Sequence, residues 1–414
     1  PATQSGKTVQ NITIRNVTVQ DVFGKYQFAD TSRGKETGGI SLFIYRPSGQ
    51  YSNTEYVRAK FKDVIIEDCI VRRVTRCGIF INASFLAVHP EKHIVHPVDG
   101  YPVTGLKIRR NIIEDCAGDG VIVRFAKDAL VERNRAKNNH SGDEGPQGVE
   151  GPQYVGHGVA LWCRSSSGTV FQYNHVYGTK GIKDGTAFDS DMASYGTIFQ
   201  YNYSHNNEGG FMLLMRSNQQ YPGTIIRYNI SQNDGSSANR TFHFSTYPQD
   251  VQYDAAAYIY NNTFYIKDTQ FTSANPATRI AISNNTSYKT KFYSNIFVQD
   301  NDVAVINRST NFAVWQYNHF ENFSSLPGGP ANIGNTTGAS DLSSPGDGPV
   351  SLTTIGTRTS TGAIDAGLDV YKITSNASTS NIYKKGFFME GNGGKDFYGL
   401  PVSSDSSDLP NKGA

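Results

Sequence analysis

The chain has 414 residues and a formal net charge of +2, with 38 basic and 36 acidic residues and no strongly basic cluster. This pattern gives no basis for nucleic-acid binding, and no apolar run approaches the roughly 18 residues that cross a membrane. With 41 glycines and 12% aromatic residues, the composition favours many short strands and tight turns over helices.

The first residues read as strand, NITIRNVTVQDV from Asn11, and no signal peptide is recognisable at Pro1. We therefore expect that a further segment precedes this sequence in the natural protein. Several Asn-x-Ser/Thr glycosylation sites occur, but turn asparagines in a repeat generate such sites by chance.

A short phrase recurs along the chain: an apolar residue, two variable positions and an asparagine. Its spacings are 23, 40, 28, 27, 33, 33 and 23 residues. Repeats at such periods are typical of a solenoid, so we expect one continuous coil of parallel strands. The phrase ends at Asn111, Asn134, Asn174, Asn202, Asn229, Asn262, Asn295 and Asn318.

Asparagine suits the turn of each repeat because it tolerates left-handed backbone angles, and stacked copies can hydrogen-bond from one turn to the next. Cys69 takes the asparagine position in an earlier copy of the phrase, IEDC. Cys77, Cys116 and Cys163 also lie close to the repeats. We predict four buried thiols, with one disulfide as the alternative.

A second phrase predicts the strands of one sheet, because five segments can be laid over one another: CGIFINAS, DGVIVRFA, HGVALWCR, DGTAFDSD and EGGFMLLM. They begin at Cys77, Asp119, His157, Asp184 and Glu208. In this alignment His157 lies opposite Asp119. Residues 138–156 interrupt the period, so we expect a loop there that projects beside the sheet.

The alternation of side chains decides which residues of the fourth segment face the core. The set Thr186, Phe188 and Ser190 is predicted to point inward, so Asp189 and Asp191 point outward. The aligned segments place further residues on the same outward face. These are Arg124, Trp162, Arg164, Ala187, Leu213 and Met215.

Two outward carboxylates at positions i and i+2 of a strand lie roughly 6.5 to 7 Å apart before their side chains lean. Glycoside hydrolysis needs two carboxyl groups about 5 to 9.5 Å apart, one to protonate the leaving oxygen and one to act as nucleophile or base. Asp189 and Asp191 are therefore the central catalytic candidates. Asp184 and Glu208, which each precede a glycine, are the rivals for the acid or base role.

Cationic and aromatic side chains surround these carboxylates in the alignment. Arg124 and Arg164 could hold one carboxylate charged, and Trp162 offers a flat face for a sugar ring. Further candidates for substrate contacts are His157, Lys183 and Arg216. The competing interpretation is structural: an aspartate before glycine is often a turn residue, and an outward pair can be a solvated sheet face.

After about residue 330 the repeat ends, and the sequence becomes rich in Gly, Ser, Thr and Asp. We expect residues 1–330 to form the coil and residues 331–414 to form an irregular segment that packs on it. The all-β fold class is then a parallel β-helix with an irregular C-terminal tail.

The sequence resembles secreted right-handed parallel β-helix proteins that act on carbohydrates. The clearest stretch is GTAFDSDMASYGTIFQYNYSHNNEGGFMLL from Gly185 to Leu214, and AIDAG from Ala363 and the closing LPNKGA agree with it. In style it is similar to β-xylosidases, fucosidases or xylanases, and lacto-N-biosidases of this fold, without a match to one kind. The resemblance implies a glycoside hydrolase, a glycan partner and export from the cell, and it transfers only to the carboxylates of residues 184–191 and to Glu208. The polygalacturonase segments NTD and RIK are absent from the sequence.

Two other functions stay open on the same residues. In a polysaccharide lyase, Lys183, Arg124 or His157 would abstract a proton beside a uronate, and the aspartates would neutralise its carboxylate or hold calcium. In a glycan-binding module the same face would only grip sugar. A hydrolase of this kind needs no cofactor or metal. Because carboxylates outnumber cations in the aligned column, we rank the hydrolase first; the sequence does not indicate an oligomeric state.

Overall fold

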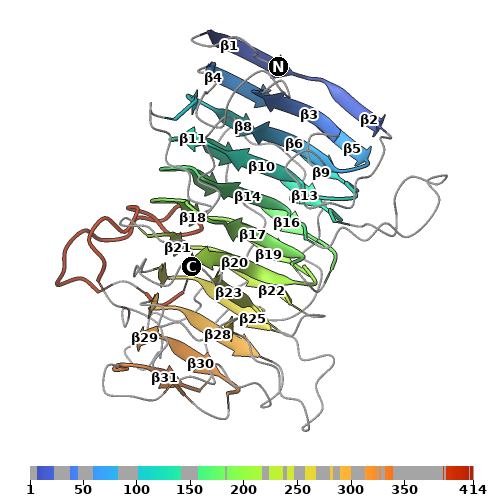
Figure 1. Ribbon diagram of the computed structural model, residues 1–414. Helices are drawn as coiled ribbons and strands as arrows, with labels where there is room; N and C mark the ends of the chain where they lie inside the picture. The colour runs from blue at the N-terminus through green and yellow to red at the C-terminus, as the bar shows by residue number, and fades with distance from the viewer. Residues whose placement is uncertain are drawn as a thin grey trace.

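The computed structural model shows an elongated stack of strands (Figure 1). The residues described by the structure are 7–22, 38–44, 59–82, 101–140, 157–181, 184–216, 223–235, 240–246, 257–266, 280–282, 290–299, 313–323, 326–327, 332–338, 386, 388–409 and 411–413. Among these residues there is no helix, so none of them forms a helix that could span a membrane.

The described strands form three parallel sheets, and successive strands of one sheet come from successive turns of the coil. The twelve-stranded sheet contains β1 (Thr8–Arg15), β4 (Lys60–Glu67), β7 (Val103–Thr104), β8 (Lys107–Arg109), β11 (Ala126–Lys127), β12 (Leu130–Glu132), β15 (Val170–Gln172), β18 (Ile198–Gln200), β21 (Ile225–Arg227), β24 (Tyr258–Tyr260), β27 (Thr290–Tyr293) and β29 (Ala313–Gln316).

The eleven-stranded sheet contains β2 (Thr18–Val22), β5 (Ile70–Val74), β9 (Ile112–Glu114), β13 (Arg135–Lys137), β16 (His175–Tyr177), β19 (Tyr203–His205), β22 (Ile230–Gln232), β25 (Thr263–Ile266), β28 (Ile296–Gln299), β30 (His319–Glu321) and β31 (Thr336–Thr337). The eight-stranded sheet contains β3 (Gly38–Phe43), β6 (Cys77–Asn82), β10 (Val121–Arg124), β14 (Leu161–Arg164), β17 (Thr186–Ser190), β20 (Gly210–Arg216), β23 (Phe242–Thr246) and β26 (Ile280–Ile282).

The repeat asparagines form the predicted ladder at the corner between the twelve- and eleven-stranded sheets. The backbone N–H of Asn174 donates to Oδ1 of Asn202 at 2.9 Å, and that of Asn202 donates to Asn229 at 3.0 Å. At the first rung, the backbone N–H of Cys69 donates to Oδ1 of Asn111 at 3.0 Å. Each side chain therefore satisfies a buried donor of the preceding rung.

The left-handed backbone angle falls one residue before each ladder asparagine. Tyr173, Tyr201 and Tyr228 have φ angles of 55°, 56° and 51°. The prediction that asparagine itself takes this conformation is wrong. Asparagine suits the next position because its short side chain offers an acceptor to one neighbouring rung and a donor to the other.

The interior of the coil is apolar and stacked. Phe171 lies on Phe199 with ring centroids 4.7 Å apart, and Phe188 packs edge-on against Phe199 at 5.6 Å. All four cysteines are buried and free, as predicted. Side chains from successive turns of the coil thus stack into one continuous core of phenylalanine and aliphatic residues.

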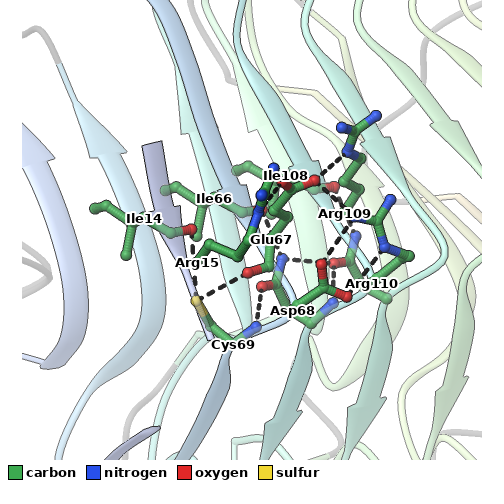
Figure 2. Close-up of polar contacts among 11 residues, drawn as sticks. Ile14, Arg15, Ile66, Glu67, Asp68, Cys69, Ile108, Arg109 and Arg110 are labelled. Atoms are coloured by element: carbon green, nitrogen blue, oxygen red, sulfur yellow. Dashed lines mark hydrogen bonds and ion pairs between the residues drawn. The ribbon is translucent and has the colours of Figure 1, made fainter. Parts of the chain in front are cut away.

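A cluster of charges ties the first turns of the coil together (Figure 2). The carboxylate of Glu67 is fully buried and ion-paired with Arg15, with Arg109 at 2.6 Å and with Arg110 at 2.6 Å. Arg110 also pairs with Asp68 at 2.8 Å. The cluster therefore joins β1, β4 and β8, which are neighbours in the twelve-stranded sheet.

The described C-terminal residues lie against the side of the coil (Figure 1, red). The hydroxyl of Tyr201 donates to the carbonyl of Lys395 at 3.1 Å, and Arg227 donates to the carbonyl of Gly391 at 2.6 Å. Further along, the buried ammonium of Lys412 donates to Oγ1 of Thr336 at 2.8 Å. Met389 and Val402 of this segment pack against a cluster of four tyrosines on the coil: Tyr201, Tyr228, Tyr260 and Tyr293.

Candidate active site

The candidate site lies on the outer face of the eight-stranded sheet. Register places Asp189 of β17 between Trp162 of β14 and Leu213 of β20. The neighbouring residue Phe188 belongs to the main core cluster, so Asp189 faces outward, as the alternation predicted. Ala187, predicted outward, is an exception because it also belongs to that cluster.

One step of the predicted register is wrong. Val121 of β10 pairs with Leu161 of β14, whereas the sequence alignment placed it opposite Val159. Asp119 consequently does not lie opposite His157. Because side chains alternate with a period of two, a slip of two residues leaves the alternation within β14 intact, so the alternation could not reveal it. Val159, which the alignment placed inward, belongs instead to the outer cluster with Trp162.

Asp189 and Asp191 differ in their surroundings. The side chain of Asp189 is nearly enclosed, with the residue 4% exposed. Asp191 follows at the end of β17, where Oδ2 lies 3.6 Å from a guanidinium nitrogen of Arg164. Its Oδ1 accepts the backbone N–H of Met192 at 2.6 Å. Asp191 is thus oriented by a cation and a backbone donor, whereas Asp189 lies deeper in the face.

Asp184 and Glu208 each have a cationic or ionisable neighbour. Nδ1 of His157 lies 3.1 Å from Oδ2 of Asp184, and both side chains are partly exposed. Glu208 lies 3.4 Å from the ammonium of Lys180 and accepts the backbone N–H of Gly181 at 2.7 Å. The structure therefore brings the predicted His157 and Asp184 together and gives Glu208 a separate set of partners.

Trp162 is not an open platform. It is 5% exposed and belongs to a buried cluster on the outer side of the sheet with Cys77, Phe80 and Ile122. Its indole N–H donates to Oδ1 of Asp119 at 2.8 Å. The expectation that its ring is free to stack on a sugar is corrected, because neighbouring side chains enclose it.

The sequence reasoning missed His243 and Arg240. His243 of β23 pairs with Leu213, which extends the row of Trp162 and Asp189 by two strands. Burial, followed by the charge of Arg240, lowers the pKa of His243 to about 4, while Asp184 opposes that shift. His243 is therefore neutral at pH 7. The alternation in TFHFS, with Phe242 and Phe244 in the core, was the available signal.

The remaining predicted binding residues have different outcomes. Arg124 of β10 pairs with Arg164 of β14, which places two arginines side by side on the outer face. The backbone of Arg216 pairs with Thr246 in β23. Lys183 and the side chain of Arg216 fall outside the described residues. Within the described part, no three His, Cys, Asp or Glu side chains gather as a metal site would require.

Comparisons with known proteins agree with this architecture. A family model described as a right-handed β-helix region matches residues 95–264. In sequence, the chain is similar to a lacto-N-biosidase of Bifidobacterium longum subsp. longum, with 26% identity over 407 residues. That match covers 92% of this chain but 24% of the relative, so the chain spans about a quarter of the relative's length.

The chain also matches several solved structures. A pectate lyase matches with a TM-score of 0.50 and 11% identity, covering 98% of this chain and 88% of the lyase chain. A lacto-N-biosidase from Eubacterium ramulus matches with a TM-score of 0.47 and 20% identity, covering 72% of this chain and 43% of the other. The chain is thus a right-handed parallel β-helix similar in sequence to a carbohydrate-active enzyme, as its repeats and resemblance predicted.

Proposed function

We propose that the protein is a glycoside hydrolase that cleaves an oligosaccharide or polysaccharide on the outer face of the eight-stranded sheet. The observation that carries the proposal is that Asp189 faces outward from β17, while Asp191, which directly follows the strand, is paired with Arg164. The sequence similarity to a lacto-N-biosidase extends over 92% of the chain and supports the same class of reaction.

The surroundings of the two aspartates suggest how the roles divide. Asp191 is oriented by Arg164 and by the backbone N–H of Met192, which suits a carboxylate that acts as nucleophile or activates water. Asp189 is the more enclosed group and is assigned the general acid, which protonates the leaving oxygen. Asp184, beside His157, and Glu208, beside Lys180, are the alternative acids.

A polysaccharide lyase is the second candidate, and the adjacent Arg124 and Arg164 favour it because paired cations suit a uronate carboxylate. Arg164 is however engaged with Asp191 on the same face. The likeness to a pectate lyase structure concerns the fold and does not bear on the reaction. The hydrolase proposal therefore ranks first.

The proposal includes a glycan partner and export from the cell, in keeping with the secreted proteins that the sequence resembles. Hydrolysis by two carboxylates requires neither metal nor organic cofactor. Calcium belongs only to the lyase alternative, in which it would neutralise the uronate.

Single substitutions test the assignment. With a glycan that the protein cleaves, Asp191→Asn and Asp189→Asn should each lower kcat by about a hundredfold or more, because each removes a group that acts in the transition state. Asp184→Asn and Glu208→Gln are measured beside them, because Asp184 and Glu208 are the alternative acids. Full activity of both Asp189→Asn and Asp191→Asn would refute the pair, and a loss confined to Asp184→Asn or Glu208→Gln would move the acid role there.

A further inference from the structure

Asp119 is a buried carboxylate outside the proposed catalytic pair, and its contacts converge on the strand that leads into the site. It is fully buried, and Oδ1 accepts two hydrogen bonds from one segment of chain. The backbone N–H of Val159 donates at 3.1 Å and the indole N–H of Trp162 donates at 2.8 Å. The other oxygen, Oδ2, faces Arg76 at 3.5 Å and the thiol of Cys77 at 3.7 Å.

These contacts hold the start of β14 in its register. Val159 lies two residues after His157, and His157 carries the imidazole that meets Asp184 at 3.1 Å. Trp162 is the strand neighbour of Asp189. One carboxylate oxygen of Asp119 thus fixes two points of the segment that presents His157 to Asp184 and Trp162 to Asp189.

The negative charge of Asp119 is paired with the guanidinium of Arg76. Arg76 is itself buried, with its side chain 7% exposed, and it immediately precedes β6 of the same sheet. A buried carboxylate is tolerated when it is ion-paired and hydrogen-bonded. Removing it leaves its buried partners without an acceptor or a counter-charge. Arg76 therefore anchors Asp119 to the preceding turn of the coil, and Asp119 anchors β14.

We infer that Asp119 is a positioning residue for the site on the eight-stranded sheet, acting through Val159 and Trp162. Its hydrogen bonds to Val159 and Trp162 are the contacts through which it acts. The inference rests on the proposed function for its effect on turnover, whereas its effect on β14 does not depend on any activity.

The test compares Asp119→Asn with Asp119→Ala. The asparagine keeps an acceptor oxygen for Val159 and Trp162, and the alanine removes it. Glu67→Ala is the matched control, because Glu67 is another fully buried carboxylate held by arginines, on the twelve-stranded sheet (Figure 2). Amide hydrogen exchange of residues 157–164 is measured together with kcat and KM on a cleaved glycan.

The expected result is graded. Asp119→Ala should speed amide exchange at Val159 and lower kcat at least about tenfold. Asp119→Asn should keep slow exchange at Val159 and most of kcat. Glu67→Ala should change neither the exchange at Val159 nor kcat, although it should lower the stability of the protein. Unchanged exchange at Val159 in Asp119→Ala would overturn the inference, as would equal losses of kcat in Asp119→Asn and Asp119→Ala. If the wild type cleaves no glycan, the proposed function fails, and the exchange result still decides whether Asp119 holds β14.

Discussion

The side-chain amide of Asn174 donates to Oδ1 of Asn202 at 3.0 Å, and the backbone N–H of Asn174 donates to the same oxygen at 2.9 Å. Asn202 in turn donates to the carbonyl of Phe171 at 2.9 Å. One buried amide therefore satisfies three groups of the neighbouring turn. The same arrangement recurs along the corner, so the ladder fixes the stacking of successive turns.

Replacing Asn202 by alanine should destabilise the protein strongly. The change leaves two buried donors of Asn174 without their acceptor and removes one of the hydrogen bonds to the carbonyl of Phe171, at a cost of about 3 kcal/mol or more. Urea denaturation followed by circular dichroism measures the difference. The control is Asn206→Gly, because Asn206 is exposed and its φ of 55° suits glycine. Equal stability of Asn202→Ala and wild type would contradict the role of the ladder.

The buried carboxylate of Asp234 should make the stability of the protein depend on pH. Asp234 accepts hydrogen bonds from Asn207 at 3.0 and 2.7 Å and from Ser231 at 2.7 Å, yet burial raises its pKa to about 6. Between pH 4 and 6, roughly, the unfolded chain has released a proton that the folded protein keeps, so stability should fall as pH rises through this window.

Asp234→Asn removes this titration and keeps the shape of the group. At pH 7 the variant should be more stable than the wild type by about 1 to 3 kcal/mol, and the fall between pH 4 and 6 should flatten. Melting temperatures across that range measure it, with the exposed Asp405→Asn as control. A lower melting temperature at pH 7 for Asp234→Asn would show that the negative charge itself is stabilising.

The charge cluster of Figure 2 should resist acid. Burial would raise the pKa of Glu67, but hydrogen bonds from Arg109, Arg15 and Arg110 lower it to about 2. A depressed carboxyl pKa adds stability above its ordinary value, and that stability is lost as pH falls from about 4.5 through 2. Glu67→Gln should therefore lower the melting temperature at pH 7 and reduce its fall in acid; an unchanged temperature at pH 7 would contradict the role of this pairing.

Two hydrogen-bonded histidines, His175 and His205, should add acid sensitivity at a higher pH than Glu67 does. Nε2 of His205 lies 3.0 Å from Nε2 of His175, and burial lowers the pKa of His205 to about 4 and that of His175 well below its usual value. In the unfolded chain these histidines bind protons near pH 6.5, whereas in the folded protein they stay neutral to a lower pH. The stability of the folded protein should therefore fall as the pH drops from about 6.5 to 4. His205→Gln should weaken that fall, whereas His157→Gln, at a partly exposed residue, should not; an identical slope in His205→Gln and wild type would refute it.

The sequence was sufficient to predict the coil because its fold is repetitive. Each ladder asparagine marks a corner, and the alternation around Phe188 marks the core face, so local patterns repeat the global architecture. The φ angle of Tyr173 could not be read from the pattern, because both residues of the pair Tyr173 and Asn174 are compatible with the turn.

The site was harder to predict because it depends on contacts between turns. β14 comes after the interruption of the repeat at residues 138–156, so the repeat does not fix its register on β10. A slip of two residues leaves the alternation intact, and the contact of Asp119 with Trp162 could therefore not be predicted from the sequence. Enclosure of Trp162 likewise depends on neighbours from other turns. His243 was within reach of the alternation, but its segment lacks the glycine that is the second residue of each of the five aligned segments.

Incubation of the purified protein with neutral and uronate-containing glycans in heavy-oxygen water distinguishes hydrolysis from elimination and from binding alone. Hydrolysis should give products whose new reducing end carries heavy oxygen by mass spectrometry, with no ultraviolet absorbance of unsaturated sugar. Asp191→Asn should lose this product. Unsaturated products without heavy oxygen would contradict hydrolysis and establish the lyase alternative. Glycan binding without either product would contradict catalysis altogether.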